Sequence, residues 1–300
     1  MLLTDAMTER KRPAKTANQL SVMLNQVLGP ERFPVDVKAL ALEYSKSTCS
    51  DPIVEVVGGD FNDFNGMLKS SSDQTRWMII YNANSTEGRQ RFTIAHELGH
   101  YLLHRQNQSL FECGDATVDR DIEKEADLFA ATLLMPMDDF RRQVDGEKPS
   151  FQLFSFLAER YGVSLTAAAV RWVEMAKQRA VLVASRDGFM LWATSNDAAY
   201  KSGAVFATRK NTIPMPDTAL AVREDLPQYG ETRTVAASEW FPRESNAVVL
   251  TEMMVATEQY DYTLTLLLLP DFDNVDACFD SEVELEDTYD HFIRNGQLPY

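Results

Sequence analysis

The sequence predicts an α+β protein: a mainly helical N-terminal domain with a small β-sheet, a helical connector and a β-rich C-terminal domain. Two observations support this fold class. Between residues 16 and 177, apolar residues mostly recur at the spacing of amphipathic helices, and three short β-rich stretches interrupt them. After about residue 180, short apolar runs alternate with Gly, Pro, Asn and Asp, as is typical of strands and turns.

These patterns divide the chain into four parts. From Asp271 onward there are nine acidic residues and one basic residue, so this last segment is expected to be a solvated acidic tail. The parts are a disordered lead (1–15), a first domain (16–148), a helix-turn-helix-like helical segment (149–179) and a β-rich domain with the acidic tail (180–300).

Composition restricts the class of protein and of partner. The 300 residues are 45% hydrophobic and 25% charged, which is ordinary for a soluble globular protein with its own core. The formal net charge of −16 argues against direct binding of nucleic acid, since phosphates would be repelled. Cys49, Cys113 and Cys278 form no CxxC pair, and no segment has the length of a signal peptide core or a membrane span. We therefore expect a cytoplasmic protein with reduced thiols.

Local signals place the elements of the first domain. Gly29-Pro30 stops the first helix, and Pro136 stops the last one. Asn84, Ser85 and Thr86 are candidate N-caps for the central helix. The expected elements are helices ending at Leu28 and spanning 35–44, strands at 53–57, 64–68 and 76–81, and helices at 87–104 and 119–135.

The later elements follow from the same reasoning. Two amphipathic helices are expected at 151–160 and 165–177, joined at Gly162. Strands are expected at 181–184, 189–193, 218–222, 247–250 and 263–269.

The central helix carries the pattern His96-Glu97-Leu98-Gly99-His100, an H-E-x-x-H motif. Residues four apart share one face of a helix, so both imidazoles can bind one metal ion, and zinc is the expected metal. Glu97 is displaced by one residue and can reach a water at the open position of the metal. It is therefore the candidate general base.

A catalytic zinc site needs a third protein ligand. His104 is nearest in sequence, but it lies eight residues after His96 and should point past the metal. It is therefore expected to have a structural role or to support a ligand from behind. Glu123 and Asp127 form an E-x-x-x-D pair on one face of the next helix. This pair resembles the arrangement in the thermolysin-like, or gluzincin, metallopeptidases, and the resemblance implies Glu123 as the ligand and Asp127 as the acceptor that orients His96. Glu125 is the rival ligand, but no acid follows it one turn later.

At these residues the sequence resembles the ImmA/IrrE-type metallopeptidases, which have a zincin-like fold. The resemblance spans roughly residues 34–140, and Tyr161-Gly162-Val163-Ser164 is similar to the helix-turn-helix-like segment that follows the peptidase in that family. It does not extend beyond about residue 180. The stretches that carry it are Gly66–Leu68, Trp77–Asn82, Arg89–His100, Glu123–Ala131 and Leu133–Pro136.

The resemblance implies a zinc endopeptidase that cleaves a protein substrate, a helix-turn-helix repressor or similar regulator, and so relieves repression. It matches His96, His100 and Glu123 to the family's ligands and Glu97 to its general base. The strand at 76–81 is expected to pair with an extended substrate as an added strand. The alternative is a zinc-containing, antitoxin-like binding protein with little proteolysis. A zinc hydrolase acting on a small amide is a third reading, and no oligomeric state is predicted.

Overall fold

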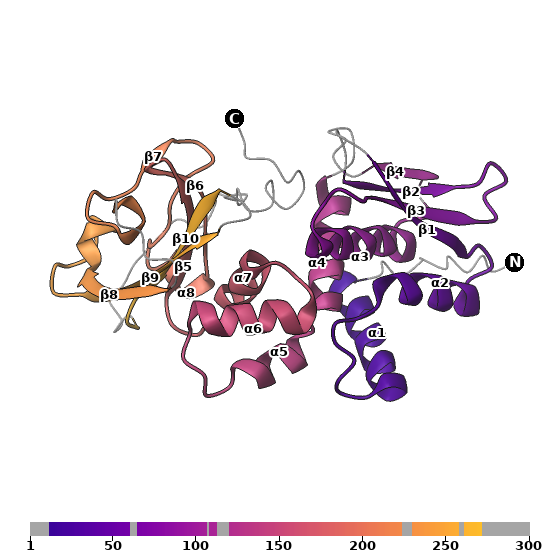
Figure 1. Cartoon of the computed structure of the whole chain (residues 1–300), viewed down its shortest axis with the longest axis horizontal. Coiled ribbons are helices and arrows are strands. Elements are labelled where there is room, and N and C mark those ends of the chain that lie inside the picture. Colours follow the sequence, from indigo (N-terminus) through magenta and orange to yellow (C-terminus); the bar gives the residue numbers. More distant parts are fainter. Residues whose placement is uncertain are drawn as a thin grey trace, which may run out of the picture. The chain divides into compact units, whose positions relative to one another are not determined.

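The computed structural model describes residues 12–60, 65–106, 108–112, 120–223, 230–257 and 261–271. The chain divides into two compact units, which we call unit 1 (1–146 with 159–163) and unit 2 (147–158 with 164–300). Both units contain helices and a sheet, which confirms the α+β class (Figure 1). The four-part domain scheme stays a prediction. Among the described residues, no helix has both the length and the apolar character that crossing a bilayer requires.

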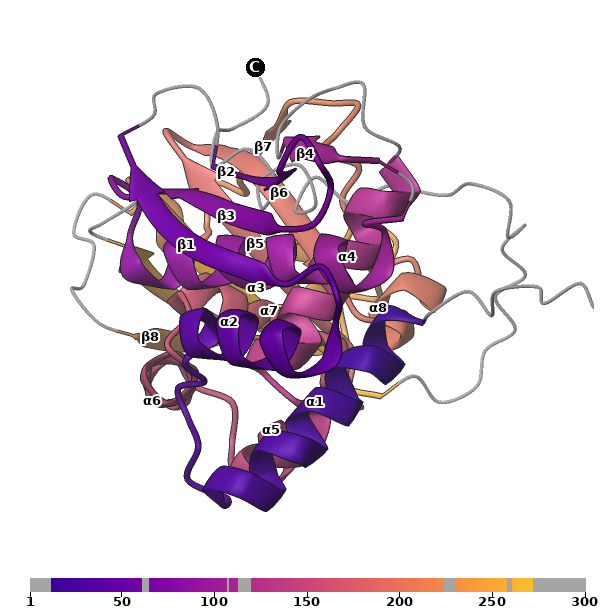
Figure 2. The same cartoon turned by 90° about the vertical axis from the view of Figure 1, so that its right-hand side faces the viewer.

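Unit 1 is built on a four-stranded sheet with the strand order β1-β3-β2-β4, and these strands run side by side in Figure 2. β1 is parallel to β3, whereas β2 is antiparallel to β3 and to β4. α3 packs against β2 and β3 and against α4. In chain order the elements are α1 (Pro13–Leu28), α2 (Val37–Thr48), β1 (Ile53–Gly59), β2 (Gly66–Ser70), β3 (Trp77–Asn82), α3 (Glu87–Leu103), β4 (Leu110–Glu112), α4 (Arg120–Leu134) and α5 (Met137–Val144).

Local chemistry explains where the helices begin and end. Pro13 occupies the first turn of α1, and Gly29 ends it with a φ of +83°, a conformation that favours glycine. Thr86 caps α3 by accepting a hydrogen bond from the backbone N–H of Arg89. The prediction that the disordered lead extends to residue 15 is therefore wrong for 13–15, which are helical. Residues 1–11 lie outside the described part of the chain.

Sheet order corrects a second prediction. β3, the strand expected at 76–81, lies between β1 and β2, so both of its edges are already paired. It cannot accept a substrate as an added strand, because its backbone groups are used within the sheet. Within the described residues the edge strands are β1 and β4. The predictions also missed α5 and the three-residue β4, and α2 begins and ends later than the expected 35–44.

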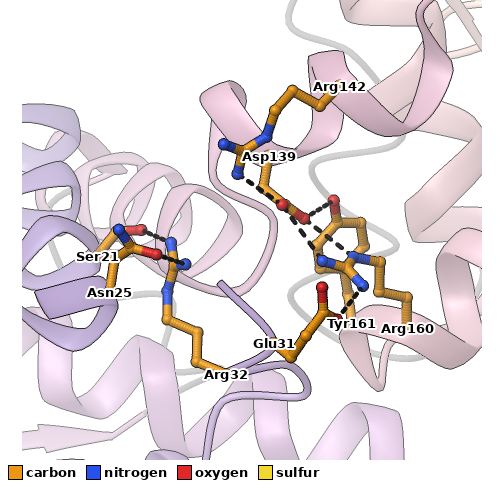
Figure 3. A network of polar contacts seen from close by, with 8 residues as sticks. All are labelled: Ser21, Asn25, Glu31, Arg32, Asp139, Arg142, Arg160 and Tyr161. Atoms are coloured by element: carbon orange, nitrogen blue, oxygen red, sulfur yellow. Dashed lines mark hydrogen bonds and ion pairs between the residues drawn. The ribbon is translucent and has the colours of Figure 1, made fainter. Parts of the chain in front are cut away.

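A network of polar contacts ties three parts of unit 1 together (Figure 3). The carboxylate of Asp139 on α5 is buried, with 1% of the residue exposed, and accepts hydrogen bonds from Arg160 and Tyr161 at 3.0 and 2.8 Å. Arg160 also pairs with Glu31 at 3.1 Å. Arg32 donates to Ser21 and Asn25 of α1, at 2.7 and 3.0 Å. The last turn of α6 (Phe151–Tyr161) is thereby fixed to α5 and to the loop after α1.

Unit 2 contains a six-stranded antiparallel sheet with the order β7-β6-β5-β10-β9-β8. α7 packs on β5 and β6. A tight turn at Asp187-Gly188, both with positive φ, joins β5 to β6. The elements after α6 are α7 (Leu165–Met175), β5 (Ala180–Arg186), β6 (Phe189–Ser195), α8 (Asp197–Lys201), β7 (Ile213–Pro214), η1 (Leu220–Val222), β8 (Glu231–Ala236), η2 (Ala237–Glu239), β9 (Val249–Thr257) and β10 (Tyr262–Leu268).

The strand expected at 218–222 is wrong, because Leu220–Val222 is a 3₁₀ helix. The backbone N–H of Leu220 donates to the buried carboxylate of Glu252 at 2.7 Å instead of to a neighbouring strand. Sequence reasoning also missed β7, β8 and α8. The acidic tail lies outside the described residues from 272 onward, as do Cys113 and Cys278.

Candidate metal centre

α3 places His96 and His100 one turn apart on a buried face, with 1% of each residue exposed. Their Nε2 atoms lie 2.9 Å apart. Glu123 of α4 lies opposite, with its carboxylate oxygens 3.4 Å from His96 Nε2 and 3.2 Å from His100 Nε2. The three ligand atoms lie within 4.8 Å of one another. The structure therefore brings together two histidines from one helix and a glutamate from another.

The close approach of α3 and α4 depends on Gly99, the residue before His100. A Cβ atom added at Gly99 would lie 3.0 Å from the Phe129 ring and 3.3 Å from the Ala126 Cα atom. Both neighbours are fully buried on α4. A residue without a side chain at this position lets the two helix backbones come near enough for the glutamate to meet the histidines.

His96 is also held from its other ring nitrogen. Its Nδ1 lies 2.8 Å from Oδ1 of Asp127, one turn after Glu123 on α4. A carboxylate accepts the Nδ1–H proton, which leaves Nε2 without a proton and directed at the cluster. The E-x-x-x-D pair of α4 therefore supplies one group at the cluster and one behind it.

Glu97 lies next to the cluster and is fully buried. Within the described residues neither carboxylate oxygen has a hydrogen-bond partner. Burial raises the pKa of Glu97 to about 8 in the chain alone. A Cβ atom at Gly66 of β2 would lie 3.4 Å from its Oε1, so the backbone of β2 passes close by. A buried carboxylate without a partner fits a site where a cation and its water complete the surroundings.

The charges of the cluster suit a divalent cation. Burial lowers the pKa of His100 to about 4, so its imidazole is neutral at pH 7. Burial opposes ionisation of Glu123, but its polar contacts with the His100 and His96 rings outweigh it and lower its pKa. Neutral imidazoles and a carboxylate are the donors of catalytic zinc sites that keep one position open. The residues present therefore fit a zinc ion.

The two rival ligands lie outside the cluster and contact each other. Nε2 of His104 is 3.0 Å from Oε2 of Glu125, and Nδ1 of His104 is 3.2 Å from Nδ1 of His100. Phe111 of β4 stacks on the His100 ring, with centroids 4.7 Å apart. The sequence did not reveal the stacking of Phe111, because β4 is too short to show a pattern, nor the Glu125–His104 contact, because that pair joins two helices.

The basic and aromatic residues near the motif have packing roles. The Tyr101 hydroxyl donates to the backbone oxygen of Asp51 at 3.0 Å. Arg91 donates to the backbone oxygens of Gly162 and Val35, at 3.0 and 2.6 Å. These contacts turn both side chains to neighbouring backbone.

Known proteins resemble the segment that contains this cluster. Residues 49–173 match the IrrE N-terminal-like domain. The chain is 32% identical over 89 residues to the metallopeptidase ImmA of Bacillus subtilis, covering 29% of this chain and 51% of that protein. It is 30% identical over 107 residues to the radiation response metalloprotease IrrE of Deinococcus radiodurans, covering 34% of this chain and 33% of that protein. The match thus spans about half of the first relative and a third of the second.

Proposed function

We propose that the chain is a zinc-dependent endopeptidase of the ImmA/IrrE family, because residues 49–173 match the IrrE N-terminal-like domain. One observation carries the proposal: His96, His100 and Glu123 converge while the buried carboxylate of Glu97 lies beside them without a partner in the described residues. A protein that only bound zinc would have no physical need for that carboxylate.

In this mechanism His96, His100 and Glu123 hold the ion, and Asp127 keeps His96 oriented. Bound zinc supplies the Lewis acid that activates water and polarises a carbonyl. The carboxylate of Glu97 accepts a proton from the attacking water and delivers it to the nitrogen of the leaving amine. Its burial excludes bulk water from that proton transfer.

We further propose that an extended substrate pairs with β4. It is the edge strand next to β2 in the described part of unit 1, and its residue Phe111 lies on the ring of His100. A substrate strand added at this edge would run beside the cluster. This replaces the interior strand β3 in that role.

For the substrate we propose a transcriptional repressor, as the family resemblance implies. The net charge of −16 favours a basic protein partner over nucleic acid. Cleavage of the repressor would then relieve repression.

The test compares new protein N-termini in cells that express the wild type, Glu97→Gln or Glu43→Gln. Glu43 is an exposed acid on α2 and serves as the matched control. Cuts present with the wild type and the control, but absent with Glu97→Gln, support the proposal and identify the substrate. Equal cleavage with Glu97→Gln would rule out Glu97 as the general base.

Metal content separates the remaining outcomes. The wild type and Glu97→Gln should each hold about one zinc per chain, whereas His96→Ala should lose it. Zinc-loaded protein that produces no cuts would favour the antitoxin-like binding protein. Wild-type protein that binds no zinc would contradict both readings.

A further inference from the structure

A second pair of residues lies behind the cluster, on the far side of His100. His104 is the C-cap of α3 and is buried, with 4% of the residue exposed. Its two ring nitrogens face different partners: Nδ1 lies 3.2 Å from Nδ1 of His100, and Nε2 lies 3.0 Å from Oε2 of Glu125 on α4. The three side chains thus form an unbroken line of hydrogen-bonding groups.

The donors and acceptors of these three side chains allow only one arrangement of protons along the line. A neutral imidazole has one N–H donor and one bare nitrogen acceptor, and an ionised carboxylate only accepts. Glu125 therefore requires the proton of His104 on Nε2, which leaves Nδ1 of His104 bare. The facing Nδ1 of His100 must then donate. Its Nε2 is consequently bare, and this is the atom directed at His96 and Glu123.

The reverse assignment places two acceptors face to face. If Nδ1 of His104 carried the proton, its bare Nε2 would face the carboxylate of Glu125 at 3.0 Å. Nε2 of His100 would then carry a proton and could not bind a metal. The charge of Glu125 selects between the two tautomers through one intervening ring.

Building on the zinc site of the proposed function, we propose that Glu125 and His104 are positioning residues that hold His100 in its metal-binding tautomer. They do for His100 what Asp127 does directly for His96. Phe111 fixes the plane of the same His100 ring by stacking on it. α4 therefore contributes a ligand and the anchors of both histidine ligands.

The direct test is the tautomer of His104 in the wild-type chain, read from two-bond ¹⁵N–¹H correlations of ¹⁵N-histidine-labelled protein. The chain has only four histidines, so the spectrum is simple to assign. His104 should carry its proton on Nε2 and His100 on Nδ1, with zinc bound. A proton on Nδ1 of His104 would overturn the proposal.

Zinc affinity, measured by competition with a chromophoric chelator, gives the second readout. Glu125→Gln and His104→Phe should each weaken zinc binding about 10- to 100-fold, the usual effect of removing such a support. The amide of glutamine can either accept or donate, so Glu125→Gln keeps the shape and removes the selection. Glu43→Gln removes an equal charge elsewhere in unit 1 and should leave the affinity unchanged.

The outcomes separate this proposal from the proposed function. Folded variants that bind zinc as tightly as the wild type would overturn the role of Glu125 and His104 while the zinc site stands. A wild type that takes up no zinc would refute the proposed function. The His104 tautomer in the metal-free chain would still test whether Glu125 and His104 set the tautomer of His100. The same measurement serves if both variants fail to fold.

Discussion

Gly99 offers a sharp test of how the two helices form the candidate metal centre. On a solvent-facing helix surface, Gly→Ala stabilises by about 1 kcal/mol because alanine loses less backbone entropy on folding. At Gly99 the added Cβ would lie 3.0 Å from the Phe129 ring and 3.3 Å from the Ala126 Cα atom. Carbon atoms prefer separations of about 3.5–4.0 Å. Since both neighbours are fully buried, neither can move away without disturbing α4.

The balance of the two effects gives the expected magnitude. Overpacking of a buried contact costs about 1–3 kcal/mol, and the gain from helix propensity offsets about 1 kcal/mol of this, so the net cost is centred on about 1 kcal/mol. Gly99→Ala should therefore lower the free energy of unfolding by about 1 kcal/mol. Gly99→Val adds two further methyl groups at the same place and should cost about 3 kcal/mol. Both changes push α4 outward, so Glu123 should lose contact with the histidines.

The assay is urea denaturation in the presence of a chelator, so that metal binding does not contribute to the measured stability. Zinc affinity is then measured on the same variants by chelator competition. Gly99→Ala should bind zinc more weakly than the wild type, and Gly99→Val more weakly still. An alanine variant that is about 1 kcal/mol more stable, with unchanged zinc affinity, would refute the close-approach reasoning.

Four further predictions concern the supporting contacts and the bound metal. Asp127→Ala should weaken zinc binding about 10-fold in chelator competition, and unchanged affinity would contradict its role behind the cluster. Asp139→Ala leaves Arg160 and Tyr161 without their buried acceptor and should lower the free energy of unfolding by about 3 kcal/mol in urea titrations, so a variant as stable as the wild type would speak against the network. Burial raises the pKa of Asp139, but hydrogen bonds from Arg160, Tyr161 and Arg142 outweigh it and lower the pKa below its ordinary value. This stabilisation is complete above the unfolded pKa of about 4 and is lost as pH falls toward the folded pKa. The stabilities of the wild type and Asp139→Asn should therefore converge as pH falls below about 4. Stability curves that stay parallel over this pH range would contradict the prediction. Added zinc should stabilise the wild type by about 4 kcal/mol at 1,000 times Kd and so raise its melting temperature. The melting temperature of His96→Ala should not change.

Much of the local structure of unit 1 could be predicted from the sequence. The expected helix at 87–104 forms as Glu87–Leu103, and the expected helix at 119–135 forms as Arg120–Leu134. Capping residues and apolar periodicity act within a few residues, so a linear sequence displays them directly. For the same reason the four-residue spacing of His96 and His100 was enough to place both on one face of a helix.

Contacts between distant segments were decided only by the tertiary structure. The sequence showed a strand at 76–81 but not that β1 and β2 would enclose it, because strand order depends on pairing across the whole sheet. Apolar composition suggested a strand at 218–222, yet the carboxylate of Glu252, 32 residues away from Leu220, stabilises a 3₁₀ turn there.

The candidate metal centre shows the same distinction between local sequence and tertiary packing. The spacing of the histidines and of the E-x-x-x-D pair is a property of two separate helices and can be read from each of them. The meeting of Glu123 with both histidines, and of Glu125 with His104, depends on how closely α3 and α4 pack. That distance is set by buried side chains such as Phe129 against Gly99, because packing is a property of the folded interior and not of any one segment.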